Sequence, residues 1–225
     1  GQTLAIIGAT GSGKTTLASL IPRFYDATAG TVLVDGLDVR EYTFDALYNK
    51  LGYVTQKAVL FSGTVEDNVF FGQSAAEKTD ASLQAALSLS QAAEFVDKYP
   101  EKAAHPIAQL GRNVSGGQKQ RLSIARALAR TPEILIFDDS FSALDYKTDA
   151  VLREGLAKEL PDTTKIIVAQ RISTIRNADQ ILVLDRGEIA GLGTHDALMA
   201  SCTVYREIAM SQLSEEELKK GGASK

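Results

Sequence analysis

A glycine-rich loop near the start of the chain carries the residues best suited to hold phosphate groups. The loop fulfils the pattern G-x-x-x-x-G-K followed by Ser or Thr, and its expected phosphate contacts are Gly8, Ala9, Thr10, Gly11, Ser12, Gly13, Lys14, Thr15 and Thr16. Glycines let backbone N–H groups turn toward an anion, and a helix that begins there points its positive end the same way. Lys14 supplies a charge for the β- and γ-phosphates, and the Thr15 hydroxyl can ligate Mg²⁺. A chance glycine-rich turn is the alternative, and the position between an apolar run and a helix argues against it.

An apolar run that ends in an acid supplies a second candidate metal ligand. Residues 134–138 read Ile-Leu-Ile-Phe-Asp, so a buried strand would deliver the carboxylate of Asp138 to the edge of a sheet. Apolar strands that end in Asp are common, and this one alone would mean little. Beside the glycine-rich loop it indicates a magnesium site made by Thr15 and Asp138.

Strand and helix patterns alternate around these groups. Apolar runs predict strands over 3–7, 51–55, 133–137, 165–169 and 180–184, and helical spacing predicts helices over 14–21, 44–50, 146–160 and 196–210. An Asp35-Gly36 turn predicts a hairpin over 30–39. Such alternation is typical of an α/β fold with a mostly parallel sheet covered on both faces.

Between these elements lies a long block with helical spacing and no strong strand. We expect a single domain over 1–225, in which 1–56 and 130–210 form the core, 57–129 form an inserted helical subdomain, and 211–225 form a flexible tail. The chain opens on Gly1, without an initiator Met, and is expected to be a piece of a longer polypeptide. No apolar run reaches the roughly 18 residues that span a bilayer, and no signal peptide is visible. A membrane part, if one exists, is therefore expected elsewhere.

Composition bears on the classes of partner. The net charge is −4 with acids and bases interspersed, which argues against a duplex nucleic-acid binder, because such proteins usually show a basic face. Cys202 is the single cysteine, so no internal disulfide can form, and we expect it to be an inert packing residue.

A second loop of small residues begins another predicted helix. Val114 is followed by Ser115, Gly116, Gly117 and Gln118, and then by the run 119–128. This stretch resembles the signature motif of ABC transporter ATP-binding domains, with Val114 in place of the usual Leu. The resemblance implies a P-loop NTPase (RecA-like) core, a partial antiparallel β-subdomain, the inserted ABC helical subdomain, and ATP with Mg²⁺ as cofactors.

In that family two domains pair head to tail. Each ATP lies between the phosphate loop of one domain and the signature of the other, so the resemblance implies a second ABC ATP-binding domain as partner, with Ser115–Gln118 serving the partner's ATP. It further implies a transmembrane domain, no nucleic acid, and a place at the cytoplasmic face of a membrane, most simply the cell membrane.

Other stretches resemble the family at the expected intervals. Gln56 resembles the glutamine that touches the metal or the attacking water and relays to the membrane domain. Residues 60–69 resemble the exporter form of the helical subdomain, and 142–145 resemble the loop at the dimer seam. We therefore expect an exporter, with Gln56 and 60–69 as the transmission contact.

Two departures fall on the residues nearest the chemistry. Asp139 stands where the family places the Glu that polarises the attacking water, and its carboxylate is one methylene shorter. Gln170 stands where the family places a His that touches the γ-phosphate, and an amide cannot carry a proton or positive charge. Neither His195, expected at a helix start, nor His105, expected in a loop, substitutes for it.

The combination resembles the degenerate half of a heterodimeric exporter. The catalytic candidates Asp139, Gln170 and Gln56 would hydrolyse ATP slowly, while the intact signature would serve a competent, non-identical partner. An ordinary slow homodimeric ATPase is the alternative. A soluble ABC protein acting on DNA or ribosomes, and a module that binds nucleotide without hydrolysis, are two further classes.

The family's adenine-stacking aromatic residue lies upstream of position 1. Tyr25 and Tyr53 are expected to be packing residues rather than substitutes for it. Nothing in the sequence identifies the transported molecule.

Overall fold

The computed structural model describes residues 1–73 and 78–212. Its centre is a six-stranded sheet with the order β10-β9-β1-β8-β7-β4. The strands are β1 (Thr3–Gly8), β4 (Leu51–Val54), β7 (Ile134–Asp138), β8 (Thr164–Val168), β9 (Gln180–Asp185) and β10 (Glu188–Gly193). All neighbours pair in parallel except β10, which runs antiparallel to β9 at the edge. The α/β fold with a mostly parallel sheet is confirmed, and β10 is an addition to the predicted strands.

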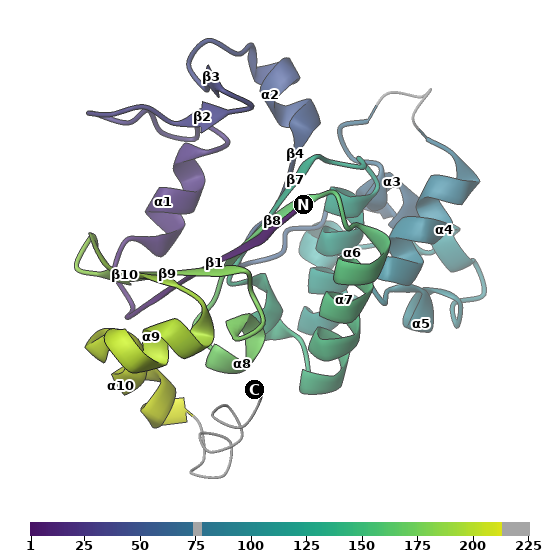
Figure 1. The fold of residues 1–225 in the computed structure, drawn as a ribbon. Coiled ribbons are helices and arrows are strands. Elements are labelled where there is room, and N and C mark those ends of the chain that lie inside the picture. Colours follow the sequence, from purple (N-terminus) through teal and green to yellow (C-terminus); the bar gives the residue numbers. More distant parts are fainter. Residues whose placement is uncertain (74–77, 213–225) are drawn as a thin grey trace.

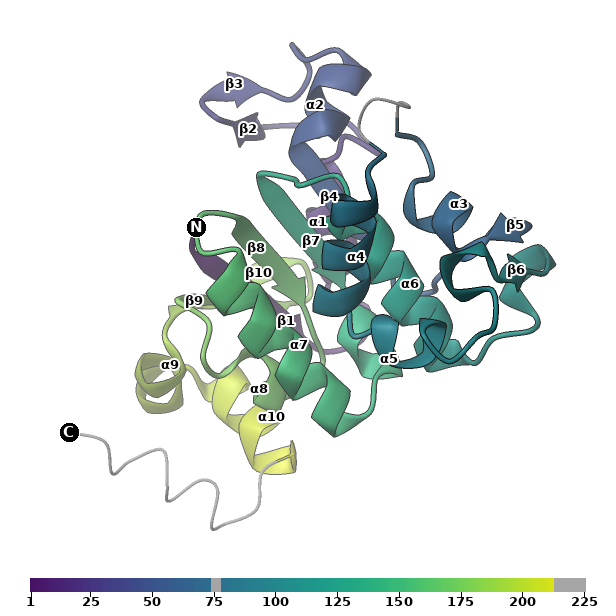
Figure 2. The same cartoon turned by 90° about the vertical axis from the view of Figure 1, so that its right-hand side faces the viewer.

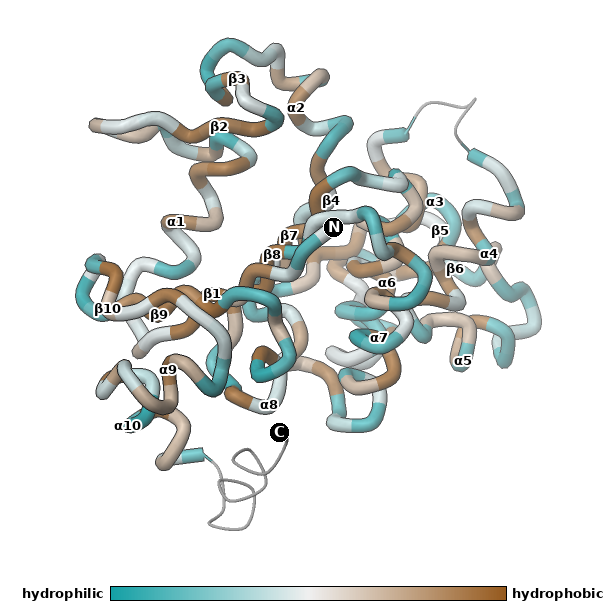
Figure 3. The backbone as a smooth tube through the Cα atoms, in the orientation of Figure 1, coloured by the Kyte–Doolittle hydropathy of each residue, from teal (hydrophilic) through white to brown (hydrophobic). Residues whose placement is uncertain are grey.

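Helices cover both faces of this sheet (Figure 1). Successive side chains of a strand point to opposite faces. Ile6 of β1 therefore joins a cluster with Ala18 of α1 (Lys14–Leu20), whereas Ile7 joins the larger core on the other face. That larger core includes buried residues of α6 (Gly116–Leu128), α7 (Tyr146–Glu159) and α10 (Thr203–Gln212). Figure 3 shows the hydrophobic residues concentrated along the central strands between these layers.

The block predicted to be helical contains α3 (Val65–Val69), α4 (Asp80–Leu89) and α5 (Ala93–Val96), which gather around α6 (Figure 2). It also holds two short antiparallel strands that the sequence did not predict, β5 (Gly63–Thr64) and β6 (Pro106–Ile107). Two 3-10 turns, η2 (Lys102–Ala104) and η3 (Gln109–Gly111), lie in the same block. Three of its helices begin with reciprocal capping boxes, in which Thr64, Thr79 and Ser115 each accept from a backbone N–H three residues on. Such caps satisfy backbone donors that a helix start leaves free.

A small antiparallel hairpin packs with α2 against the starts of β4 and β7. Strands β2 (Leu33–Val34) and β3 (Leu37–Asp38) join through Asp35 and Gly36, which both have positive φ, as predicted for the Asp-Gly turn. Helix α2 (Phe44–Lys50) follows and lies where it was expected, with Thr43 as its N-cap.

The predicted last helix is wrong in one respect, because it is two helices. Helix α9 (His195–Ser201) ends at Cys202, whose backbone is extended (φ −108°, ψ 108°), and α10 starts at Thr203. Cys202 is buried against β10, with its Sγ 3.6 Å from the carbonyl oxygen of Ala190. It is thus a packing residue, and its burial turns the chain. A short helix α8 (Ile172–Ile175) is a further element that the sequence did not predict.

Two other expectations concern segments at the margins. Residues 211 and 212, expected in the tail, belong to α10, and the rest of the expected tail lies outside the described residues. Tyr25 is 67% exposed, so the expectation that it packs is wrong. No helix within residues 1–73 and 78–212 is long and apolar enough to cross a bilayer.

Candidate nucleotide site

The site forms at one edge of the sheet, where the carboxyl ends of four parallel strands meet. Strands β1, β8, β7 and β4 are successive neighbours, so the segments that follow them must lie close together. These segments carry the glycine-rich loop, Gln170, the pair Asp138 and Asp139, and Gln56. The topology thus brings together residues that are far apart in the sequence.

The glycine-rich loop follows β1 and leads into α1. Gly13 is the N-cap of α1 with φ 98° and ψ 5°, a left-handed conformation that residues with a Cβ rarely adopt. Gly8 lies so close to β9 that a Cβ there would come within 2.2 Å of the carbonyl oxygen of Leu184. The turn between β9 and β10 supports the loop from outside, because the Gly187 N–H donates to the Ser12 carbonyl at 3.1 Å.

The ammonium group of Lys14 is held inside this loop. Lys14 is buried, and its Nζ donates to the carbonyl oxygens of Gly8 at 2.9 Å and Ala9 at 2.8 Å. Burial lowers the pKa of Lys14, and the nearby carboxylates of Asp139 and Asp138 oppose that shift. A cation is therefore fixed between the loop carbonyls and two acids.

Two hydroxyl groups hold the carboxylate of Asp138. Thr15 Oγ1 donates to Oδ1 at 2.8 Å, and the Tyr53 hydroxyl donates to Oδ2 at 3.2 Å. Burial, together with the charge of Asp138, raises the pKa of Tyr53 to about 12. Tyr53 also packs edge-on against Phe24, with ring centroids 5.2 Å apart. It is a packing residue as expected, but its contact with Asp138 was missed; its position on the strand beside Asp138's own strand was the available sign.

The donor set at Asp138 suits magnesium. Mg²⁺ prefers oxygen ligands and is usually held by one or two carboxylates, with the rest supplied by waters and substrate phosphates. Thr15 and Asp138 provide one hydroxyl and one carboxylate, adjacent to the phosphate loop. No group of three or more His, Cys, Asp or Glu that could hold a metal occurs in the part of the chain that the structure describes, so a protein-only cage is absent there.

The three catalytic candidates are in direct contact. The Gln56 and Gln170 side-chain amides both donate to Oδ2 of Asp139, at 2.9 and 2.8 Å. Burial raises the pKa of Asp139, and these two hydrogen bonds oppose part of the rise. Asp139 also has φ 48° and ψ 25°, a left-handed conformation that Asp tolerates better than most residues.

The small-residue loop at Ser115 forms a separate helix start. Ser115 and Gln118 cap each other, with Gln118 Oε1 accepting from the Ser115 N–H at 2.8 Å. A Cβ on Gly116 would meet nothing within 4 Å, so this turn is open to an approaching group. Among the described residues, no hydrogen bond joins this loop to the glycine-rich loop.

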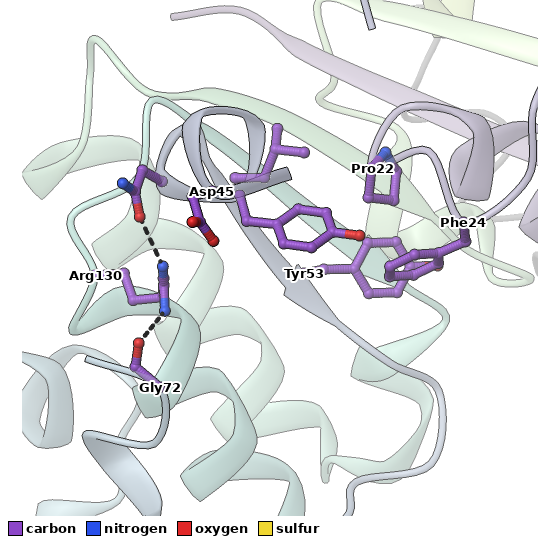
Figure 4. Close-up of a pocket in the computed structure, with 9 residues that line it drawn as sticks. Pro22, Phe24, Asp45, Tyr53, Gly72 and Arg130 are labelled. Atoms are coloured by element: carbon purple, nitrogen blue, oxygen red, sulfur yellow. Dashed lines mark hydrogen bonds between the residues drawn. The ribbon is translucent and has the colours of Figure 1, made fainter. Parts of the chain in front are cut away.

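A pocket of about 610 Å³ lies beside Tyr53, lined by the segment after α1, by α2 and β4, and by Gly72 and Arg130 (Figure 4). The labelled side chains of Pro22 and Phe24 line one end, and Arg130 lines the other. Arg130 donates to the Gly72 carbonyl at 3.2 Å and to Asn49 Oδ1 at 3.1 Å, and so joins the two walls.

Both histidines have partners outside the site. His195 begins α9, as expected, and its Nδ1 lies 2.8 Å from the hydroxyl of buried Tyr205. His105 lies in a loop, stacked on Tyr99 with ring centroids 3.8 Å apart. Neither occupies the position of Gln170 at Asp139.

Comparison with known proteins identifies related chains. Residues 1–142 match the family described as ABC transporter. An uncharacterized ABC transporter ATP-binding protein of Mycobacterium tuberculosis is 50% identical over 213 residues, which are 94% of this chain and 36% of that protein. An ATP-dependent lipid A-core flippase of Syntrophus aciditrophicus is 41% identical over 218 residues, 97% of this chain and 36% of the flippase. The chain thus spans about a third of the length of these relatives.

A solved structure shows the same fold. The structure of a bacterial Atm1-family ABC exporter with ATP bound superposes with a TM-score of 0.90 at 37% identity, over 95% of this chain and 37% of that one.

Proposed function

This chain belongs to the ABC transporter family, as an ATP-binding domain of the exporter type, and from that premise we propose that it binds MgATP, pairs with a second such domain and drives transport. Its place would be the cytoplasmic face of a membrane, against a transmembrane domain. The glycine-rich loop from Gly8 to Thr16 would cradle the phosphates. Thr15, Asp138 and Gln56 would face the magnesium ion, which would polarise the phosphate oxygens when bound.

We propose further that this site hydrolyses ATP slowly. The observation that carries this is the single carboxylate oxygen of Asp139, which accepts from both Gln56 and Gln170. A general base must lie within hydrogen-bond reach of the water that it deprotonates, so geometry comes before basicity. Burial makes Asp139 more basic, but its short side chain is already engaged by two amides, and no imidazole is present at position 170.

The signature loop supports the second half of the proposal. Ser115 and Gln118 form a regular cap, and the turn is open at Gly116. We propose that this loop completes the ATP site of a non-identical, hydrolytically competent partner domain. An isologous pairing of two copies of this chain is the alternative, with two slow sites.

The contact with the transmembrane domain is proposed at Gln56 and residues 60–69, within a helical subdomain over 57–129. Phe61 and Phe71 are 43% and 51% exposed and stack with their centroids 4.3 Å apart. Arg126 fixes the segment beneath them, donating to the Asn68 carbonyl at 2.7 Å and the Val59 carbonyl at 3.0 Å. Exposed apolar patches of this kind mark interaction surfaces.

The test is steady-state MgATPase of the chain at millimolar ATP, beside the double variant Asp139→Glu, Gln170→His. A nearly silent natural chain and a gain of about tenfold or more in the variant are expected, since a positioned general base contributes about 10²–10⁴-fold. The matched control makes the same two changes on exposed positions, Asp97→Glu and Gln84→His, and should gain nothing. A natural chain that turns over rapidly, with no gain in the variant, would remove the slow-site proposal and leave an ordinary homodimeric motor.

A further inference from the structure

The last described residue of α10 contacts the loop that carries Gln170. Gln212 Nε2 donates to the Gln170 carbonyl oxygen at 2.7 Å, and the Ile172 N–H donates to Gln212 Oε1 at 2.9 Å. One side-chain amide therefore bonds the loop at two backbone positions, one on each side of Arg171. Rotation of the backbone at Arg171 would break at least one of these bonds.

Near this point the loop is also held by the Thr174 N–H, which donates to the Arg171 carbonyl oxygen at 3.2 Å. Its start is anchored where the Ala169 N–H donates to the Ile6 carbonyl at 3.1 Å. Gln170 and Arg171 are exposed, and Arg171, the N-cap of α8, makes no side-chain capping bond. Gln212 thus supplies to α8, from another helix, an acceptor for one of the backbone N–H groups that a helix start leaves free.

Helix α10, which carries Gln212, is anchored in the hydrophobic core. Tyr205 and Ala209 of α10 are fully buried in the larger core, and the Tyr205 hydroxyl bonds to His195 of α9. The opposite end of the same path is the Gln170 side chain, whose Nε2 donates to Asp139. A continuous chain of contacts therefore runs from α10 through Gln212 and Gln170 to the nucleotide site.

We propose that Gln212 is a positioning residue, which holds Gln170 at Asp139 and so lets α10 set the geometry of the γ-phosphate side of the site. The inference rests on the proposed function, in which Gln170 stands beside the γ-phosphate. Because ADP lacks that phosphate, loss of Gln212 should weaken the binding of ATP and leave the binding of ADP unchanged.

The experiment measures the affinity of the whole chain for MgATP and for MgADP by titration calorimetry, together with amide hydrogen exchange at Ile172. Gln212→Ala should accelerate exchange at Ile172 and weaken MgATP by about threefold to tenfold, the effect of one or two hydrogen bonds. Ser211→Ala is the matched control, because within residues 1–73 and 78–212 the Ser211 hydroxyl donates only to the Ile208 carbonyl of its own helix. It should change neither readout.

A double-mutant cycle separates positioning from general stability. If Gln212 acts through Gln170, then Gln212→Ala should cost nothing further in a Gln170→Ala background. Gln212→Glu keeps an acceptor for the Ile172 N–H and lacks the donor to the Gln170 carbonyl, so it should protect Ile172 and still weaken MgATP. Gln212→Glu replaces Gln212→Ala in the test if Gln212→Ala melts at a markedly lower temperature than the natural chain.

Several outcomes would overturn the inference. Faster exchange at Ile172 with unchanged nucleotide affinities would reduce Gln212 to a cap for α8. An equal loss for ATP and ADP, or a loss that persists without the Gln170 side chain, would show that it does not act through that residue. A natural chain that binds neither nucleotide would instead remove the proposed function, and this inference with it, before any variant is compared.

Discussion

The hydroxyl of Tyr53 donates a 3.2 Å hydrogen bond to Oδ2 of Asp138, the carboxylate oxygen opposite the one that Thr15 contacts. Both oxygens of the candidate metal ligand are thereby oriented by a hydroxyl group. Thr15 is itself a candidate ligand, whereas Tyr53 is one step removed from the metal, and partners in that position fix the direction of the ligand and tune the affinity for the ion.

Tyr53→Phe should therefore lower the affinity for Mg²⁺ in the presence of ATP by about tenfold, which is the low end of what such partners contribute. The ring and its packing on Phe24 remain, so little else should change. Mg²⁺ titration at fixed ATP measures the effect. Tyr42→Phe is the control, because it loses a 3.0 Å bond to the Val34 carbonyl, away from the site. Equal Mg²⁺ curves for both variants would show that Tyr53 only packs.

Lys14→Ala should lower the affinity for MgATP by about 10- to 100-fold, since hydrogen bonds to charged groups contribute roughly 1.5–3 kcal/mol. The buried ammonium is the cation held inside the glycine-rich loop. Lys57→Ala removes the same charge from an exposed position and should leave the affinity unchanged. Calorimetric titration of both variants decides, and matching affinities would place the nucleotide elsewhere.

Asp139→Asn should stabilise the nucleotide-free chain at neutral pH, and the gain should shrink as the pH falls. Burial raises the pKa of Asp139 in the folded state, so folding favours the protonated carboxyl. The natural chain therefore loses stability, relative to the variant, as the pH rises from the ordinary Asp pKa through the raised one. Urea unfolding of both proteins at pH 4 and pH 7 tests the sign. A gain that is larger at pH 4 than at pH 7 would contradict it.

Arg126→Ala should lower the free energy of unfolding by about 1–3 kcal/mol, because it removes a donor from the backbone carbonyl of buried Asn68. Arg126 bonds to the Asn68 carbonyl and side-chain oxygens and to the Val59 carbonyl. Arg130→Ala removes two bonds at a more exposed position and should cost less, about 0–1 kcal/mol. Urea unfolding compares the two, and equal losses would mean that Arg126 does not anchor the segment under Phe61.

Local patterns were enough to predict most of the fold. Helix α2 lies over 44–50 as expected, because Thr43 caps its start and the chain extends at Leu51. The buried strands were recognisable as apolar runs, and their mostly parallel direction followed from their alternation with helices. Strand β10 was missed because it is a largely exposed edge strand with glycine at 191 and 193. The break at Cys202 depends on packing against β10, which no local pattern records.

In the candidate site, too, some residues were predictable from the sequence and some contacts were not. The glycine-rich loop and Asp138 were predicted from the residue pattern, and Asp139, Gln56 and Gln170 from the resemblance to the ABC family; the structure places all of them at one sheet edge. The contacts of Tyr53 and Gln212 were not predicted, since each depends on which elements become neighbours. One oxygen of Asp139 accepts hydrogen bonds from both the Gln56 and Gln170 amides. This arrangement likewise depends on side-chain directions, which residue spacing does not determine.

The placement of β1 has a consequence for synthesis on the ribosome. This strand is made before the other strands described here, yet its two neighbours in the sheet are β8 and β9, so residue 3 pairs with residue 165 and residue 4 with residue 180. Until those late strands emerge, the nascent glycine-rich loop has no sheet beneath it. Contacts this distant in sequence also form slowly. A nucleotide at the proposed site would therefore be a ligand of the finished sheet, because the loop gains its supporting strands only after β8 and β9 have been made.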